Sequence, residues 1–212
     1  MNPKGTLRQK VEEWAKWGVR CHGYFTYSEG PERMSNMDEP GTLPIISDCS
    51  AWVTRCYKWA GAADPNGLGY NGEGYTGTLL AHGQHIPLSE AEPGDVIVYG
   101  PGTGWHTALL VHDFDGTFNQ KDPLTVSMGQ QGDPSFVRVS QDGRLPQTYL
   151  RFLPIEKPSR AVVMAALGKK PARIFKFADV AAIKQFQRDH GLLADGIVGP
   201  LTTAVMHKLG LI

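Results

Sequence analysis

The sequence has few cysteines and no long apolar run. Cysteine occurs three times in 212 residues, at Cys21, Cys49 and Cys56, and so few thiols do not make a disulfide framework in a chain of this length. No stretch approaches the about 18 apolar residues of a membrane span. The charged, amphipathic first residues contain no apolar signal-peptide core. We therefore expect free thiols and no membrane insertion, and we expect another factor to release the protein if it acts outside the cytoplasm.

Net charge is also absent, but the two ends of the chain differ in sign. Residues 1–156 contain 12 lysines and arginines against 18 aspartates and glutamates, and residues 157–212 contain 9 against 3. A basic segment on an acidic body suits a polyanionic partner such as nucleic acid, a membrane surface or an anionic polymer. A solvated basic face without a partner fits the same charges.

The pattern of the chain changes at a proline-containing stretch near residue 154. Helical spacing covers residues 7–19 and 49–60, and strand-like runs follow at 95–100, 106–113, 123–129 and 135–140. Helices followed by short strands joined by turns predict an α+β domain with a small antiparallel sheet over residues 1–154. After a linker at 155–160, residues 161–212 have the pattern of a small three-helix domain.

Cys49 is the cysteine best placed for chemistry. It follows Ser47 and Asp48, which are good N-cap residues for the predicted helix. A helix N-terminus favours the thiolate, which is the reactive form of cysteine. Cys56 lies two turns further on, where we expect core packing, and a separation of about 10 Å along the helix excludes a disulfide between the two.

A nucleophilic cysteine needs a base to take its proton. His106 is the best candidate among the seven histidines because it opens a strand directly after a glycine-containing turn. A strand end can hold an imidazole rigidly against the start of a helix. A zinc site is the alternative, with ligands drawn from His82, His85, His106, His112 and Cys49.

Three segments in this order resemble a known family. Asp48-Cys49-Ser50 at a helix start, PGDVIVY at 93–99 and WHTALLV at 105–111 are together similar to the NlpC/P60 cysteine peptidases, especially those in endolysins of phages that infect actinobacteria. The resemblance covers about residues 20–153. It implies a papain-like fold with helices packed on a small antiparallel sheet, Cys49 as nucleophile, His106 as general base, and no cofactor or metal.

The same resemblance implies further site residues. Tyr27, with Tyr24 second, would help hold the oxyanion together with the backbone N–H of Cys49. Asp48, Ser50 and Trp105 would line the substrate site. The related CHAP amidases share the order of cysteine and histidine but carry a glutamine near the nucleophile, and Asp48 in front of Cys49 favours NlpC/P60.

The third triad position departs from the family. Phage relatives have a Ser-His-Gly segment here, whereas this chain has SMGQQGDP with Met128 in place of the histidine. A methionine cannot usefully accept the imidazole N–H. We predict Gln130 as the orienting residue, with Gln131 and Ser127 as alternatives, and a Cys–His dyad stays open.

The tail resembles the peptidoglycan-binding type 1 module, a three-helix unit. The signature residues are Phe186, Gln187, Asp195, Gly196, Gly199 and Thr202. Asp195-Gly196 predicts a turn, and Pro200 after Gly199 predicts a helix start. The resemblance implies that these residues form the cell-wall-binding part of the chain.

Taken together, these features predict a phage endolysin that cuts peptidoglycan stem peptides by thiol catalysis at the γ-D-glutamyl–diaminopimelate bond. The alternatives are an N-acetylmuramoyl-L-alanine amidase, of the CHAP or the zinc kind, and a non-catalytic wall-binding protein. We expect a monomer that binds peptidoglycan but no nucleic acid. We also expect it in the host cytoplasm first and, after holin-dependent release, at the cell wall.

Overall fold

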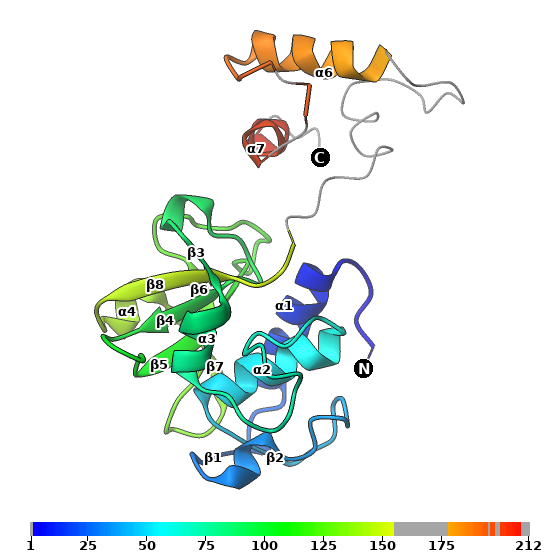
Figure 1. Ribbon diagram of the computed structural model, residues 1–212. Coiled ribbons are helices and arrows are strands. Elements are labelled where there is room, and N and C mark those ends of the chain that lie inside the picture. The colour runs from blue at the N-terminus through cyan, green and yellow to red at the C-terminus, as the bar shows by residue number, and fades with distance from the viewer. Residues whose placement is uncertain (1, 155–177, 195, 198–199, 209–212) are drawn as a thin grey trace. The chain divides into compact units, whose positions relative to one another are not determined.

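The computed structural model describes residues 2–154, 178–194, 196–197 and 200–208. The chain divides into two compact units, Met1–Pro154 and Ile155–Ile212 (Figure 1). The linker predicted at 155–160 and the helix predicted directly after it lie outside the described residues. Within the described part, no helix combines the length and the apolar character that crossing a membrane requires.

Two long helices dominate the first unit. Helix α1 (Leu7–Arg20) begins at a reciprocal capping box, in which Thr6 Oγ1 accepts from Gln9 N and Gln9 Oε1 accepts from Thr6 N. Helix α2 (Cys49–Ala60) begins at Asp48 and ends at Gly61, which has a φ of 77°. A left-handed C-cap favours glycine because it carries no Cβ. Both helices lie where the sequence predicted them.

The main sheet has six strands in the order β3-β8-β4-β5-β6-β7, and every pairing is antiparallel. Strands β4 to β7 follow one another along the chain, as the sequence predicted. Strands β3 and β8 were not predicted from the sequence. The bounds are β3 Gln84–Ile86, β4 Val96–Tyr99, β5 His106–Val111, β6 Leu124–Met128, β7 Pro134–Arg138 and β8 Gln147–Arg151.

Shorter elements connect these parts. A two-stranded parallel sheet joins β1 (Phe25–Tyr27) to β2 (Ile45–Ser47), directly before α2. The loop between β1 and β2 is held from behind by Arg55, whose buried guanidinium donates to the backbone carbonyls of Arg33 and Ser35. The remaining short helices are η1 Pro31–Met34, α3 Thr76–His82, η2 Leu88–Glu90 and α4 Val139–Asp142.

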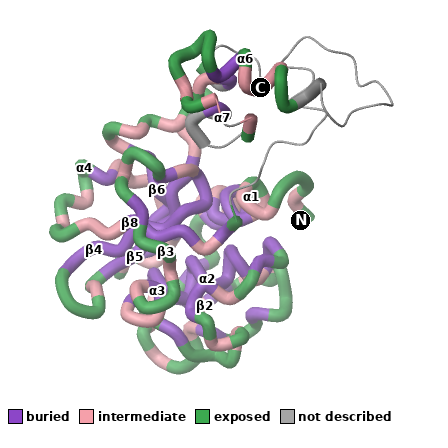
Figure 2. The backbone as a smooth tube through the Cα atoms, turned by 45° about the horizontal axis from the view of Figure 1, so that its top comes forward, coloured by how far each residue is buried: buried purple, intermediate pink, exposed green. Residues whose placement is uncertain are grey.

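Helices α1 and α2 cover one face of the sheet (Figures 1 and 2). The main core lies between these two helices and that face of the sheet. Trp14, Trp52 and Trp59 meet edge to face in this core, with ring centroids 5.0–6.2 Å apart. The sheet contributes the side chains of one parity, Val96, Val98, Leu109, Val111, Leu124, Val126, Met128 and Leu150. Thus the predicted α+β architecture, with helices packed on a small antiparallel sheet, is confirmed.

Side chains of the opposite parity form a second, smaller core. It contains Ile86, Ala91, Ile97, Tyr99, Ala108, Leu110, Val139 and Tyr149. His106 shares the parity of Ala108 and Leu110 in β5. The first residue of this strand therefore carries its imidazole on the face that turns away from the main core.

Two helices of the second unit lie in described residues, α6 (Ala178–Asp189) and α7 (Pro200–Lys208). Gln187 joins the turn between them to α7, because its Nε2 donates to Ile197 O at 2.9 Å and to Thr202 Oγ1 at 3.2 Å. Its Oε1 accepts from Gly196 N at 2.8 Å. One buried amide thus fixes the turn and the start of the next helix.

Candidate active site

Cys49 is the first residue of α2. The carboxylate of Asp48 accepts the backbone N–H of Ala51 at 2.6 Å and caps the helix. The Cys49 side chain is buried, with 7% of its surface exposed. Burial, followed by the negative charge of Asp48, raises the pKa of Cys49 to about 12, so the unliganded site holds a neutral thiol at pH 7.

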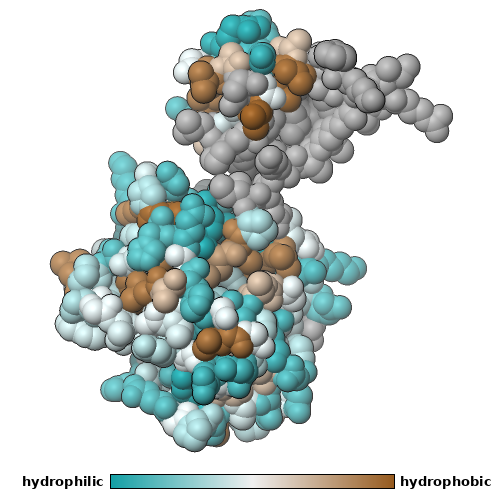
Figure 3. Space-filling model, in the orientation of Figure 1, coloured by the Kyte–Doolittle hydropathy of each residue, from teal (hydrophilic) through white to brown (hydrophobic). Residues whose placement is uncertain are grey.

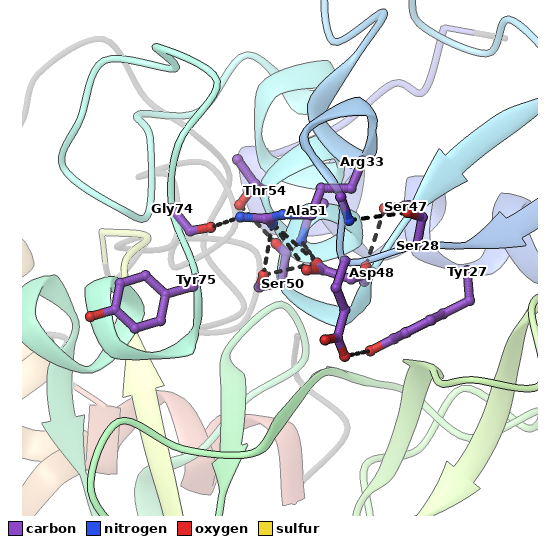
Figure 4. A network of polar contacts seen from close by, with 12 residues as sticks. Tyr27, Ser28, Arg33, Ser47, Asp48, Ser50, Ala51, Thr54, Gly74 and Tyr75 are labelled. Atoms are coloured by element: carbon purple, nitrogen blue, oxygen red, sulfur yellow. Dashed lines mark hydrogen bonds and ion pairs between the residues drawn. The ribbon is translucent and has the colours of Figure 1, made fainter.

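A polar network fixes Asp48 behind the cysteine (Figure 4). Arg33 lies 3.1 Å from Asp48 Oδ2, donates to Ser50 Oγ at 3.2 Å and also donates to Gly74 O. Ser50 Oγ donates to Asp48 Oδ1 at 2.9 Å. Asp48 and Ser50, predicted as substrate contacts, are thus buried and hydrogen-bonded to each other and to Arg33, which ties the helix start to two loops.

His106 opens β5 and is 3% exposed. Its Nε2 lies 2.6 Å from Ser127 Oγ on the neighbouring strand β6. Burial, followed by the charge of Arg144, lowers the pKa of His106 to about 4, while Asp142 acts in the opposite direction. The imidazole is therefore neutral at pH 7 and can accept a proton at Nδ1, the nitrogen that Ser127 does not bond.

The structure places Ser127 at the imidazole, where the sequence favoured Gln130. Gln130 lies beyond the end of β6 and is exposed, as is Gln131. Met128 points into the main core and is fully buried. Because side chains alternate along a strand, Met128 and Ser127 face opposite sides of the sheet, and only Ser127 shares the face of His106.

One hydrogen bond joins the two halves of the site. The backbone N–H of Thr107, the residue directly after His106, bonds the Cys49 side chain and favours its thiolate. The thiol at the start of α2 therefore lies against the start of β5. The Tyr99 ring stacks on the His106 imidazole at a centroid distance of 5.9 Å and an interplanar angle of 27°.

The predicted aromatic residues occupy different places. Tyr27 lies close enough to Cys49 for a thiolate there to raise its pKa, after the larger effect of burial, and its hydroxyl donates to Glu29 Oε1 at 3.1 Å. Tyr24, the second choice, is 57% exposed. Trp105 precedes His106 and is 65% exposed, and its ring lies over Gly100, where a Cβ would come within 2.6 Å of it.

An ion pair that the sequence did not single out completes the surroundings of the site. Arg144 binds Asp142 through Nε at 2.6 Å and through a terminal nitrogen at 2.5 Å. Its guanidinium lies 5.4 Å from the centroid of the Tyr99 ring. Asp142 ends α4 and Arg144 lies in the turn between α4 and β8, and no sequence motif connects these residues to a cysteine almost a hundred residues earlier.

The histidines considered for zinc have other contacts. His82 Nδ1 lies 2.9 Å from Thr78 O, His85 Nε2 lies 3.0 Å from Leu80 O, and His112 Nδ1 lies 2.8 Å from Glu12 Oε2. Among the residues that the structure describes, no three potential ligands are grouped for a metal ion.

The tail residues predicted to bind the wall are largely internal. Gln187 is 1% exposed, Thr202 is 3% exposed, and Phe186 is buried and stacks on His190 at 4.3 Å. Gly196 forms the turn at a φ of 79°. Asp195 and Gly199 lie outside the described residues. Three of the four described residues of the motif are thus buried in the unit, and the fourth forms its turn.

One known family matches residues of the second unit. Residues 170–206 match a putative peptidoglycan binding domain. This match covers the motif found at 186–202 and agrees with the resemblance that the sequence suggested.

The peptidoglycan endopeptidase RipB of Mycobacterium tuberculosis is 37% identical to this chain over 114 residues, which are 51% of this chain and 43% of RipB. The chain thus spans less than half the length of this curated relative. The solved structure of RipB aligns with a TM-score of 0.45 and 23% identity, over 72% of this chain and 69% of RipB. RipD of Mycobacterium tuberculosis, described as a non-catalytic NlpC/p60 domain protein adapted to peptidoglycan binding, aligns with a TM-score of 0.45 and 20% identity, over 71% of this chain and 100% of RipD.

Proposed function

We propose that this chain is a peptidoglycan endopeptidase of the NlpC/P60 type, with Cys49 as nucleophile and His106 as general base. One observation carries the proposal. The Cys49 side chain at the start of α2 bonds the backbone N–H of Thr107, the residue directly after His106, and His106 Nε2 is bonded by Ser127. The similarity to RipB and the peptidoglycan-binding match in the tail support peptidoglycan as the substrate.

The chemistry follows from this arrangement. His106 Nδ1 takes the thiol proton while Nε2–H donates to Ser127 Oγ, and the thiolate attacks the amide carbon. The Cys49 backbone N–H and the Tyr27 hydroxyl are the donors proposed for the oxyanion, and the hydroxyl proton must first turn away from Glu29. The imidazolium then protonates the leaving amine, and water hydrolyses the thioester. Because the free site holds a neutral pair, proton transfer accompanies attack.

The finer identity is part of the same proposal. We infer a phage endolysin that cuts the γ-D-glutamyl–diaminopimelate bond and is released through a holin. The basic tail of charge +6 suits an anionic wall polymer. In this proposal the protein acts as a monomer, first in the host cytoplasm and then at the wall.

The test is digestion of purified peptidoglycan by the wild type and by Cys49→Ala, followed by mass spectrometry of the released fragments. We expect new amine termini at diaminopimelate with the wild type and none with the variant. Equal release by both proteins would contradict thiol catalysis. Iodoacetamide should abolish the activity and EDTA should leave it unchanged, whereas the reverse result would indicate a zinc amidase.

A wall-binding protein without catalysis is the second candidate. The buried Cys49 with its high pKa favours it. Wall binding by the wild type, without any released fragment, would support this second candidate over the first.

A further inference from the structure

The turn between α4 and β8 brings a guanidinium to the candidate active site. Arg144 follows Gly143, which adopts a φ of 69° and reverses the chain after α4. The side chain of Asp142, only 4% exposed, binds two edge nitrogens of Arg144. A buried carboxylate that grips a guanidinium in this bidentate way fixes its plane and direction.

Asp142 anchors the Arg144 guanidinium and leaves some of its N–H donors without a bond to that carboxylate. A guanidinium carries five N–H donors, and two of them go to Asp142, which leaves three. The side chain is 39% exposed, so its free edge reaches solvent. The fully buried Tyr99 ring supports the cation from below at 5.4 Å. The side chain therefore loses little further freedom when it binds a ligand.

This anchored cation lies beside both proposed catalytic groups. Tyr99, which contacts the guanidinium, also stacks on His106. The charge of Arg144 lowers the pKa of Cys49 and, after the larger effect of burial, the pKa of His106. In return, a thiolate at Cys49 raises the pKa of Arg144. Tyr99 thus links the guanidinium to His106, and the charge of Arg144 acts on both proposed catalytic groups, so a substrate that binds there meets this cation.

A pre-oriented arginine with a free, exposed edge matches a planar anion, and a carboxylate fits its fork with two hydrogen bonds. A γ-glutamyl linkage leaves the α-carboxylate of the glutamate free, close to the bond that is cut. Resting on the proposed function, we propose that Arg144 is a specificity-determining residue that binds this carboxylate. The enzyme then selects stem peptides with a free α-carboxylate over peptides in which it is an amide.

The test uses two synthetic γ-D-glutamyl–diaminopimelate peptides, one with a free α-carboxylate and one with an α-carboxamide. Cleavage of both by the full chain gives a ratio of kcat/KM values, in which changes in the reactivity of Cys49 cancel. We expect the wild type to prefer the carboxylate at least tenfold, mainly through KM. The preference should fall to about one in Arg144→Gln. It should lie between these values in Arg144→Lys, which keeps the charge and loses the fork.

Lys121→Gln is the matched control, because it removes one exposed positive charge from the β5–β6 connection, beyond the strand ends opposite His106. It should keep the wild-type ratio. Arg144→Gln leaves the buried Asp142 without its partner, so a melting curve is measured for each variant. If Arg144→Gln does not fold, Arg144→Lys is used for the test instead. An unchanged ratio in a folded Arg144 variant would overturn the proposal.

Calorimetric binding of both peptides to Cys49→Ala separates this proposal from the proposed function. Tighter binding of the carboxylate peptide to Cys49→Ala, lost in Cys49→Ala/Arg144→Gln, supports the Arg144 contact even if the wild type cleaves neither peptide. Equal affinity for the two peptides, or no binding of either, overturns the contact. Absence of cleavage alone contradicts only the endopeptidase.

Discussion

At the scale of single residues, Ser127 stands where a third triad residue would. A serine hydroxyl can accept the Nε2–H of the imidazole, although it brings no charge to stabilise the imidazolium. The hydrogen bond of 2.6 Å to His106 therefore orients the ring, and the hydroxyl accepts from the tautomer that carries its proton on Nε2. This arrangement predicts a modest contribution to catalysis, below that of a carboxylate.

Ser127→Ala should lower the turnover of a stem peptide roughly fivefold, because a neutral hydrogen bond contributes about 1 kcal/mol. Gln130→Ala is the control, and its turnover should equal that of the wild type because Gln130 is exposed beyond β6. Steady-state kinetics with a soluble peptide measures both variants. A larger loss in Gln130→Ala than in Ser127→Ala would return the orienting role to Gln130.

His106 should also make the protein sensitive to acid. The pKa of this group is about 4 in the folded chain and near 6.5 when unfolded, so the unfolded chain binds the proton first as the pH falls. Its contribution to stability is present above pH 6.5 and is lost as the pH falls toward 4, by up to about 3 kcal/mol. Urea unfolding at pH 7 and pH 4.5 should show a smaller difference for His106→Gln than for the wild type. An equal difference would contradict the lowered pKa.

At the scale of elements, α1 and α2 approach each other closely at Gly18. A Cβ at this position would come within 2.3 Å of the Trp52 ring, which is 1% exposed and cannot move without disturbing the core. The glycine therefore has a packing role in the middle of a helix, where it otherwise costs about 1 kcal/mol relative to alanine.

Gly18→Ala should destabilise the protein by about 1–3 kcal/mol despite the better helix propensity of alanine, because the clash with Trp52 exceeds the gain. Glu13→Ala, at an exposed position of the same helix, should change stability by less than about 0.5 kcal/mol. Chemical denaturation measures both. A stabilised Gly18→Ala would show that the two helices separate freely.

The elements predicted correctly are those with local signals. Helices α1 and α2 have apolar periodicity and caps, and β4 to β7 are short apolar runs bounded by turns. Strand β8 (Gln147–Arg151) lacks such a signal, and it becomes a strand only through pairing with β3 and β4, whose residues lie far away in the sequence. The sequence favoured Gln130 over Ser127 for a related reason, since only strand pairing shows that Ser127 shares the face of His106 and that Met128 faces the core. Asp142 and Arg144 could not be predicted from the sequence, because they come close to the site only when β8, which follows them, pairs in the sheet.

At the scale of the whole molecule, the three apolar core clusters of the first unit involve residues 7–153 only. This unit therefore contains a core of its own and every proposed catalytic residue. The second unit contains the peptidoglycan-binding match and an excess of positive charge. The two units can thus be separated by experiment.

A chain that ends at Pro154 should fold, cleave a soluble stem peptide with wild-type kcat/KM, and no longer sediment with purified cell walls. The reason is that the proposal assigns wall contact to the second unit, which contains the peptidoglycan-binding match, and the chemistry to the first. Co-sedimentation of the full and shortened chains, at low and high salt, provides the measurement. Wild-type sedimentation of the shortened chain would place wall binding in the first unit.

The secondary-structure elements that hold the candidate site residues determine which of these residues can change during evolution. Cys49, His106 and Ser127 belong to a helix and to two paired strands that share one core, so changes around them disturb the fold itself. Asp142 ends α4 and Arg144 lies in the turn before β8, outside the helix and the strands that hold Cys49, His106 and Ser127 in place. If Arg144 sets the peptide preference as proposed, mutation of residues 142–145 changes that preference and leaves the elements of the proposed catalytic residues in place.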